Sequence, residues 1–176
     1  MPVSPAVTAT GSAHARGVVF LHSVPRALCP HVEWALNSLL DTDTRLAWTA
    51  QPVAPATMRA EHSWTGRPGM GSRLVSSLRT IPDLRFEVTE DPSPGHEGER
   101  YAVTPVLGIY RATIGVHGDI LVSEDRLRAA VAGAARTGAN LADGIAYLLG
   151  SAWDEELEPY RIATPDTPVR VLHQVV

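Results

Sequence analysis

A glycine-rich loop is the segment whose residue types best suit the binding of an anion. Residues 66–71 read Gly-Arg-Pro-Gly-Met-Gly, and Ser72 caps the expected start of a helix. Glycines let backbone N–H groups turn toward one point, and a helix N-terminus adds partial positive charge. A phosphate, a pantetheine phosphate or a carboxylate would suit such a cradle. The expected ligand-binding residues are His62, Gly66, Arg67, Gly69, Gly71, Ser72 and Arg73.

The same loop also has a purely structural explanation. It lacks the lysine of a P-loop and the G-x-G-x-x-G spacing of a dinucleotide-binding fingerprint. Strand-to-helix turns without any ligand are often rich in glycine. An ordinary turn is therefore the alternative to an anion site.

One thiol and two imidazoles lie close together in the sequence. Cys29 stands just before an expected helix, where the pKa of a thiol can be lowered, with His22 and His31 on either side. A thiolate near an imidazole is a nucleophile or part of a metal site. The spacing matches no zinc motif, however, and His22 falls on a strand that we expect to be buried. We therefore expect a buried cysteine, a hydrogen-bonded histidine and no metal, and the catalytic residues stay unknown.

Trp34 is the candidate for binding a protein partner. On the helix expected from Pro30 to Leu40, it lies opposite the apolar stripe, beside Asn37 and Ser38. An exposed tryptophan is either an interface anchor or is covered by another part of the chain. The sequence leaves both outcomes open.

Four carboxylates cluster at Asp154, Glu155, Glu156 and Glu158. Paired carboxylates can bind a metal or act as acid and base. On a helix these four point in several directions, so they cannot converge on one ligand. We expect a solvated helix face.

The composition excludes several kinds of chemistry. All 15 basic residues of the 176 are arginine, which removes Schiff-base chemistry, pyridoxal phosphate attachment and the P-loop lysine. We expect no cofactor. A net charge of −4 without a basic patch argues against nucleic acid, and no apolar run is long enough to span a membrane. With one cysteine and no secretory signal, we expect a cytoplasmic protein, whose association into homo-oligomers stays open.

The elements that position these residues fall into two halves. Residues 16–91 predict the order β-α-β-β-α-β of a ferredoxin-like unit. Its expected strands are 17–24, 45–50, 58–64 and 84–88, and its expected helices are 30–40 and 72–81.

The second half has a different order. Residues 92–99 are rich in proline, glycine and acid and predict a linker. Residues 100–164 predict a β-hairpin and then helices, ending in a proline-rich loop from Pro159, all packed on the first half. Residues 1–15 predict a disordered tail, and 165–176 predict a C-terminal tail or an edge strand. The fold class is α+β, arranged as a two-layer sandwich.

Three stretches are distinctive as strings of residues. They are GVVFLHSVPRALCPHVEWAL at 17–36, SWTGRPGMGSRLVSSLR at 63–79 and LADGIAYLLGSAWDEELEPYR at 141–161. As a set they resemble the actinobacterial domain-of-unknown-function family 3145 over nearly the whole chain. The resemblance implies a link to fatty-acid metabolism and supplies no catalytic residues.

Two functions follow from these observations. The first is a non-catalytic module that binds a protein partner or a small anionic ligand, as an accessory to fatty-acid metabolism. The second is an enzyme for a phosphate-bearing or acyl-thioester substrate, with Arg67 and Arg73 on the anion and His62 or His22 as base. The first is favoured, because no nucleophile, base and orienting group can be read from the spacing.

Overall fold

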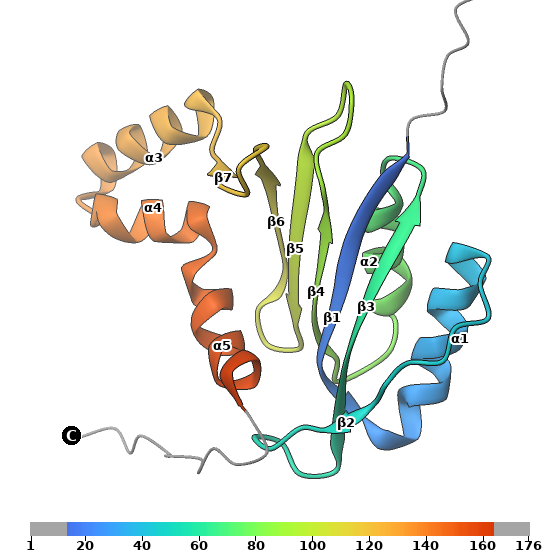
Figure 1. Cartoon of the computed structure of the whole chain (residues 1–176). Coiled ribbons are helices and arrows are strands. Elements are labelled where there is room, and N and C mark those ends of the chain that lie inside the picture. Colours follow the sequence, from blue (N-terminus) through green and yellow to red (C-terminus); the bar gives the residue numbers. More distant parts are fainter. Residues whose placement is uncertain (1–13, 164–176) are drawn as a thin grey trace, which may run out of the picture.

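A seven-stranded antiparallel sheet forms the centre of the molecule, with helices on both of its faces (Figure 1). This computed structural model describes residues 14–163, and the mixture of helices with an antiparallel sheet confirms the α+β class. The strand order is β2-β3-β1-β4-β5-β6-β7. The strands are β1 (Ala15–Pro25), β2 (Thr49–Ala50), β3 (Thr57–Gly66), β4 (Arg85–Glu90), β5 (Gly98–Thr104), β6 (Gly108–Ile114) and β7 (Ile120–Leu121).

Five α-helices accompany the sheet in the described residues. They are α1 (Cys29–Leu40), α2 (Met70–Leu78), α3 (Glu124–Thr137), α4 (Leu141–Leu149) and α5 (Ser151–Ile162), with a short 3-10 turn, η1 (Arg26–Leu28), before α1. No helix between residues 14 and 163 combines the length and the apolar character that a membrane span requires.

The main core lies between the sheet and the helices α1 and α2. Alternate residues of a strand point to the same face, so one face of β1 and β4 supplies a continuous apolar surface. The stripe on α1 and the apolar side of α2 pack on this surface. The largest side chains sealed there include Leu21, Leu36, Leu74, Leu78 and Phe86.

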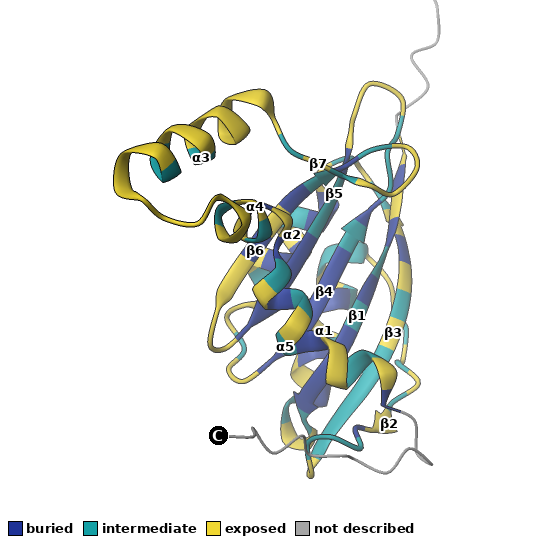
Figure 2. Cartoon of the chain, turned by 90° about the vertical axis from the view of Figure 1, so that its left-hand side faces the viewer, coloured by how far each residue is buried: buried dark blue, intermediate teal, exposed yellow. Residues whose placement is uncertain are grey.

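The helix α5 covers part of the opposite face of the sheet (Figure 2). Trp153 and Leu157 are buried against Ala102, Tyr110 and Ala112, which form a second core. The expected two-layer sandwich is therefore wrong, because α5 adds a partial third layer. The sequence pattern hides this layer, since Ala102 and Ala112 are small and give β5 and β6 a weak second apolar face.

The two halves of the chain share the one sheet. The strands β4 and β5 pair directly, with Glu90 opposite Glu99, and Ser93 bridges to His96 in the connection between them. The stretch 92–99, expected as a linker, thus joins neighbouring strands. The expected C-terminal tail or edge strand at 165–176 lies outside the described residues.

Several element boundaries differ from expectation. The extended segment 45–50 pairs only at Thr49–Ala50. The helix α2 begins at Met70, with Gly69 as its N-cap, so Ser72 lies inside the first turn. The helix α5 continues through Pro159 to Ile162, although a proline removes one helical hydrogen bond. The expected loop from Pro159 is therefore wrong for Pro159, and Pro165 and Pro168 lie outside the described residues.

Candidate functional site

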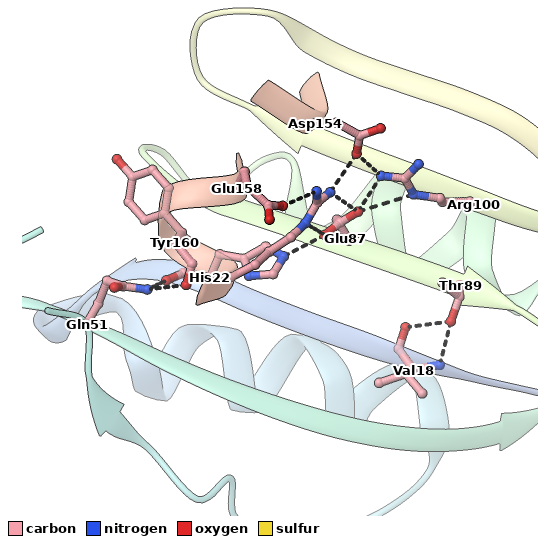
Figure 3. A network of polar contacts seen from close by, with 10 residues as sticks. Val18, His22, Gln51, Glu87, Thr89, Arg100, Asp154, Glu158 and Tyr160 are labelled. Carbon is pink, nitrogen blue, oxygen red and sulfur yellow. Dashed lines mark hydrogen bonds and ion pairs between the residues drawn. The ribbon is translucent and has the colours of Figure 1, made fainter. Parts of the chain in front are cut away.

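A buried carboxylate, Glu87, organises the face of the sheet that α5 covers (Figure 3). Its neighbours on the sheet are His22 of β1 and Arg100 of β5. The Nε2 of His22 lies 2.7 Å from one Glu87 oxygen, and Nη2 of Arg100 donates to the other at 2.8 Å. From above, Arg161 of α5 donates to both oxygens, at 2.9 and 2.7 Å.

Strand alternation places His22 on the same face of β1 as Phe20, and a bulge in β1 then returns Val24 to the main core. The pairing of β1 with β3 and with β4 slips just after Leu21 on both sides. A bulge inserts one extra residue and so changes which of the following side chains face each side of the sheet. Leu21 and Val24, three residues apart, therefore both lie in the main core, while His22 points at Glu87 on the other face.

Asp154 completes a ring of four charges with Glu87, Arg100 and Arg161. The Asp154 carboxylate accepts hydrogen bonds from Nη2 of both Arg100 and Arg161, so each arginine bridges two carboxylates. Two positive and two negative groups alternate around this ring. An isolated buried charge is costly, but here each charge faces two of the opposite sign.

The ring fixes the charge state of Glu87. Burial alone would raise the pKa of this carboxyl, but hydrogen bonds from His22, Arg161 and Arg100 outweigh burial and hold the pKa well below its usual range. The carboxylate is therefore ionised and can only accept hydrogen bonds. A neutral His22 must then carry its proton on Nε2, which leaves Nδ1 as an acceptor.

Further polar contacts tie α5 to the sheet. Glu156 accepts from Arg85 at 3.1 Å and from the Thr104 hydroxyl at 2.7 Å. The side-chain amide of Gln51 donates to the carbonyl oxygens of His22 and Tyr160. The end of α5 is thus held against β1, β4 and β5 from several directions.

An open cavity of about 540 Å³ lies beside the charge ring, over β1 and β3. Its lining combines the polar end, His22 and Glu87, with residues of β3 and of α5. The remaining walls are Phe20, Leu21, Ala47, Thr49, Arg59, Ala60, Glu61, Tyr160 and Arg161. The cavity has the mixture of apolar walls and a few polar groups that is typical of small-molecule sites.

Arg59 is the cation of the cavity that no described carboxylate neutralises. Its guanidinium donates to the Ala163 carbonyl, and it forms no ion pair with any residue from 14 to 163. Arg161, by contrast, is paired with Glu87, Asp154 and Glu158. A guanidinium has five N–H donors, so Arg59 keeps capacity for an additional acceptor.

The glycine-rich loop does gather its amides on an anion, but that anion belongs to the chain. The backbone N–H groups of Gly69 and Gly71 donate to the two Glu90 oxygens at 2.7 and 2.8 Å, and Glu90 is buried. A Cβ at position 71 would come within 3.1 Å of Glu90 Oε2, which explains a glycine there. An external anion would have to displace Glu90.

The other residues predicted for the loop site do not converge on it. Arg67 and Arg73 are exposed, and the Ser72 hydroxyl donates to the Gly69 carbonyl at 2.9 Å. His62 alternates with Trp64 on β3 and so faces the α1 and α2 side of the sheet, away from the side chain of Arg59.

The thiol and the two imidazoles lie apart. Cys29 is buried in the main core, where burial and the nearby Glu33 raise the pKa of its thiol. His22 belongs to the opposite face and His31 is exposed. Among residues 14–163, no three His, Cys, Asp or Glu side chains come together in a way that could hold a metal ion.

Trp34 is 73% exposed on the outer side of α1. No other part of the chain between residues 14 and 163 covers it. Of the two outcomes that the sequence leaves open, the structure therefore has the exposed one, and partner binding stays a prediction.

The acidic cluster corrects the sequence interpretation most clearly. Asp154 and Glu156 bind arginines of the sheet, so the expected solvated helix face is wrong for these two, whereas Glu155 and Glu158 are exposed. The sequence did hold a signal: Trp153 and Leu157, four residues apart, mark the buried side of α5. The residues that sequence reasoning missed are Arg59, Glu87, Arg100, Tyr160 and Arg161.

Comparisons with known proteins give one match. Neither the curated proteins nor the solved structures contain a match to the chain. A family model described as "Protein of unknown function (DUF3145)" matches residues 18–174. That span includes most of β1, the charge ring and the whole described lining of the cavity. The chain therefore belongs to the DUF3145 family.

Proposed function

We propose that this protein is a binding module whose small anionic ligand occupies the cavity over β1 and β3. The observation that carries the proposal is Arg59, a cation on the wall of a 540 Å³ cavity with no carboxylate partner in the described residues. The neighbouring Arg161 is already neutralised by the charge ring. An anionic group therefore gains more from Arg59 than from Arg161.

The other walls favour a ligand that also has an apolar or flat part. Phe20 lies parallel to the His22 ring, with 6.2 Å between the ring centroids, and both line the cavity with Tyr160. Aromatic walls give a large apolar contact, while Nδ1 of His22 can accept one hydrogen bond from the ligand. Glu61 also lines the cavity, beside Phe20 in the pairing of β1 with β3, and disfavours a second negative charge on the ligand there.

A thermal-shift screen tests this function with the full chain. The probes are inorganic phosphate, nucleotides, coenzyme A and acyl-coenzyme A, because these carry anionic groups with or without a flat or acyl part. A ligand that binds only the native state adds about 2.7 kcal/mol to the free energy of unfolding when it is present at 100 times its Kd, and the melting midpoint rises accordingly. We expect at least one probe with an apolar part to raise the midpoint.

Two variants decide where a positive probe binds. Arg59→Gln removes the cavity cation, whereas Arg67→Gln makes the same change in the glycine-rich loop. We expect Arg59→Gln to weaken binding by roughly ten- to a hundredfold, as the loss of a charge-assisted hydrogen bond does, and Arg67→Gln to leave it unchanged. The reverse pattern would place the ligand at the loop. Equal affinity of the probe for wild type and both variants would exclude both sites.

An enzyme is the second candidate, and the His22–Glu87 pair favours it. An ionised carboxylate that orients an imidazole is the arrangement of a general base. Among the described lining residues, the hydroxyls are those of Thr49 and Tyr160, and neither has a base beside it that would activate it as a nucleophile. His22→Asn discriminates the two functions. If wild type converts the bound probe and the variant binds it equally well without converting it, the protein is an enzyme. If neither protein converts the probe, the result supports a binding module.

We also infer that the first four strands, with α1 and α2, form a ferredoxin-like unit. What supports this is the antiparallel order β2-β3-β1-β4 with both helices on one face. Such sheets commonly leave their open face for ligands or partners, which agrees with a cavity on the face opposite α1 and α2.

The setting that we propose is cytoplasmic and accessory to fatty-acid metabolism. The family resemblance supports the pathway, and the single buried cysteine agrees with a reducing compartment. A preference for acyl-coenzyme A over free coenzyme A in the screen would support the pathway, and equal binding would remove it.

A further inference from the structure

The helix α3 is unusual because none of its 14 residues is buried. Figures 1 and 2 show α3 and α4 standing away from the sheet, with α3 coloured as mostly exposed. A helix of this length is only marginally stable in water without tertiary packing. Within residues 14–163, α3 finds no surface that buries it.

The helices α3 and α4 form a hairpin and contact each other through their smallest residues. Ala130, Gly133 and Ala134 of α3 are half-buried, and a Cβ on Gly144 of α4 would lie 3.8 Å from the Ala130 Cβ. The larger apolar side chains next to these positions are left outside the seam. Leu127, Val131, Leu141 and Ile145 are 40, 54, 37 and 38% exposed.

This distribution gives the hairpin an open apolar face. An amphipathic helix normally buries its large apolar residues and leaves small or polar ones outside. Here Leu127 and Val131 of α3 and Leu141 and Ile145 of α4 are exposed, and Leu148 is the large apolar residue of the hairpin that is buried. Grouped apolar residues of this kind mark an interaction surface rather than ordinary surface variation.

The charges of the hairpin indicate which occupant fits. The hairpin has no net charge, whereas the whole chain carries −4. Its three acidic residues and three arginines are Glu124, Asp125, Asp143, Arg126, Arg128 and Arg136. Two identical acidic molecules repel each other least where they are locally neutral. A neutral surface offers no attraction to nucleic acid or to an anionic membrane.

We propose that the α3–α4 hairpin is a homodimer interface and that a second copy of this chain covers it. Two hairpins that place their open faces together form a four-helix bundle, in which Leu127, Val131, Leu141 and Ile145 of both copies become the core. A two-fold interface pairs the same patch with itself, so mixed charges at the rim of one copy can meet the opposite charges of the other. The proposal is independent of the cavity and its ligand.

Sedimentation equilibrium of the full chain tests the interface. We expect wild type to approach twice its 18.9 kDa mass at micromolar concentration. Val131→Asp places a charge in the expected core, so its dimer dissociation constant should rise roughly 30-fold or more, as for loss of a hot-spot residue. Val131 is exposed in the single chain, so the variant should keep its circular dichroism spectrum.

The matched control is Val106→Asp, the same change at a 77% exposed valine in the turn between β5 and β6. We expect it to dimerise like wild type. Should Val131→Asp lose its helical signal, Ile145→Asp tests the same face from α4. A wild type that stays monomeric, dimers that survive both hairpin variants, or a control that dissociates equally would each overturn the proposal.

Discussion

Glu87 links α5 to two strands of the sheet through a single carboxylate. It is buried and binds His22, Arg100 and Arg161 at once. Its burial could not be predicted from the sequence, because an acidic residue between Phe86 and Val88 in a strand is normally expected to face solvent. Glu87 is buried because α5 packs over the second face of the sheet.

Glu87→Gln should destabilise the fold by about 3 kcal/mol or more, because it leaves two arginines in a buried site with one carboxylate between them. Urea unfolding measures this loss as a shift of the midpoint at constant m-value. The matched control is Glu158→Gln, which removes an exposed partner of Arg161 and should cost only about 0–1 kcal/mol. Equal losses from the two changes would contradict the ring.

Glu90→Ala tests how the glycine-rich loop is used. The change frees the Gly69 and Gly71 amides, which should cost about 1–3 kcal/mol as buried donors lose their acceptor. Inorganic phosphate should restore part of that stability in the variant, because it can take the vacant place at the helix N-terminus, and should have no such effect on wild type. Stabilisation of wild type by phosphate that Arg67→Gln abolishes would instead support an anion site at the loop.

At the scale of elements, α5 connects the second core with the wall of the cavity. Its buried side carries Trp153 and Leu157, and its end carries Tyr160 and Arg161. The helix itself could be predicted from its pattern, but the direction of its acids could not. The face that a helix turns inward depends on what it packs against, and beneath α5 the strands β5 and β6 offer two alanines and a single large side chain, Tyr110.

Leu157→Ala should destabilise the protein by about 2–5 kcal/mol, because this leucine is fully buried between α5 and the sheet. Hydrogen exchange should show loss of protection in α5 before loss in β1 and β4, since the helix forms its own cooperative contacts. The exposed Leu149→Ala is the comparison and should change stability by less than about 1 kcal/mol. Uniform loss of protection across the sheet would argue against a separately docked α5.

The local patterns of the sequence predict most element types, because apolar periodicity is a short-range property. The strands β1, β3 and β4 and the helices α1 and α2 follow their patterns, whereas α3 forms where its pattern predicts a helix but buries none of its residues. The candidate site could not be predicted in the same way. Arg59, Glu87, Arg100 and Arg161 come from four elements, and nothing in their spacing states that they meet.

At the scale of the whole molecule, the charge ring makes stability depend on acid. The pKa of Glu87 is held below its unfolded value, and hydrogen bonds from Arg100 and Arg161 also lower the pKa of Asp154 against the opposing effect of burial. Carboxyls with lowered pKa values contribute their full stability above the unfolded pKa, about 4.3 for glutamate, and lose it as the pH falls toward the folded value. We therefore expect the melting temperature to be level from pH 7 to about 5 and to fall steeply below.

The same titration of Glu87→Gln separates this residue from the other carboxylates. The variant should start from a lower melting temperature at pH 7 and lose less of it between about pH 5 and 3, because one of the titrating groups is gone. Parallel curves for wild type and variant would show that the acid sensitivity comes from elsewhere.

The cavity is the central claim of this account, and an NMR titration tests it most directly. The chain is labelled with ¹⁵N and titrated with the probe that gives the largest thermal shift. The account predicts that the amide signals of Phe20, His22, Arg59 and Glu61 move together with one dissociation constant, while those of residues 66–71 stay in place. Movement confined to the glycine-rich loop, or saturation without any change around Arg59, would contradict it.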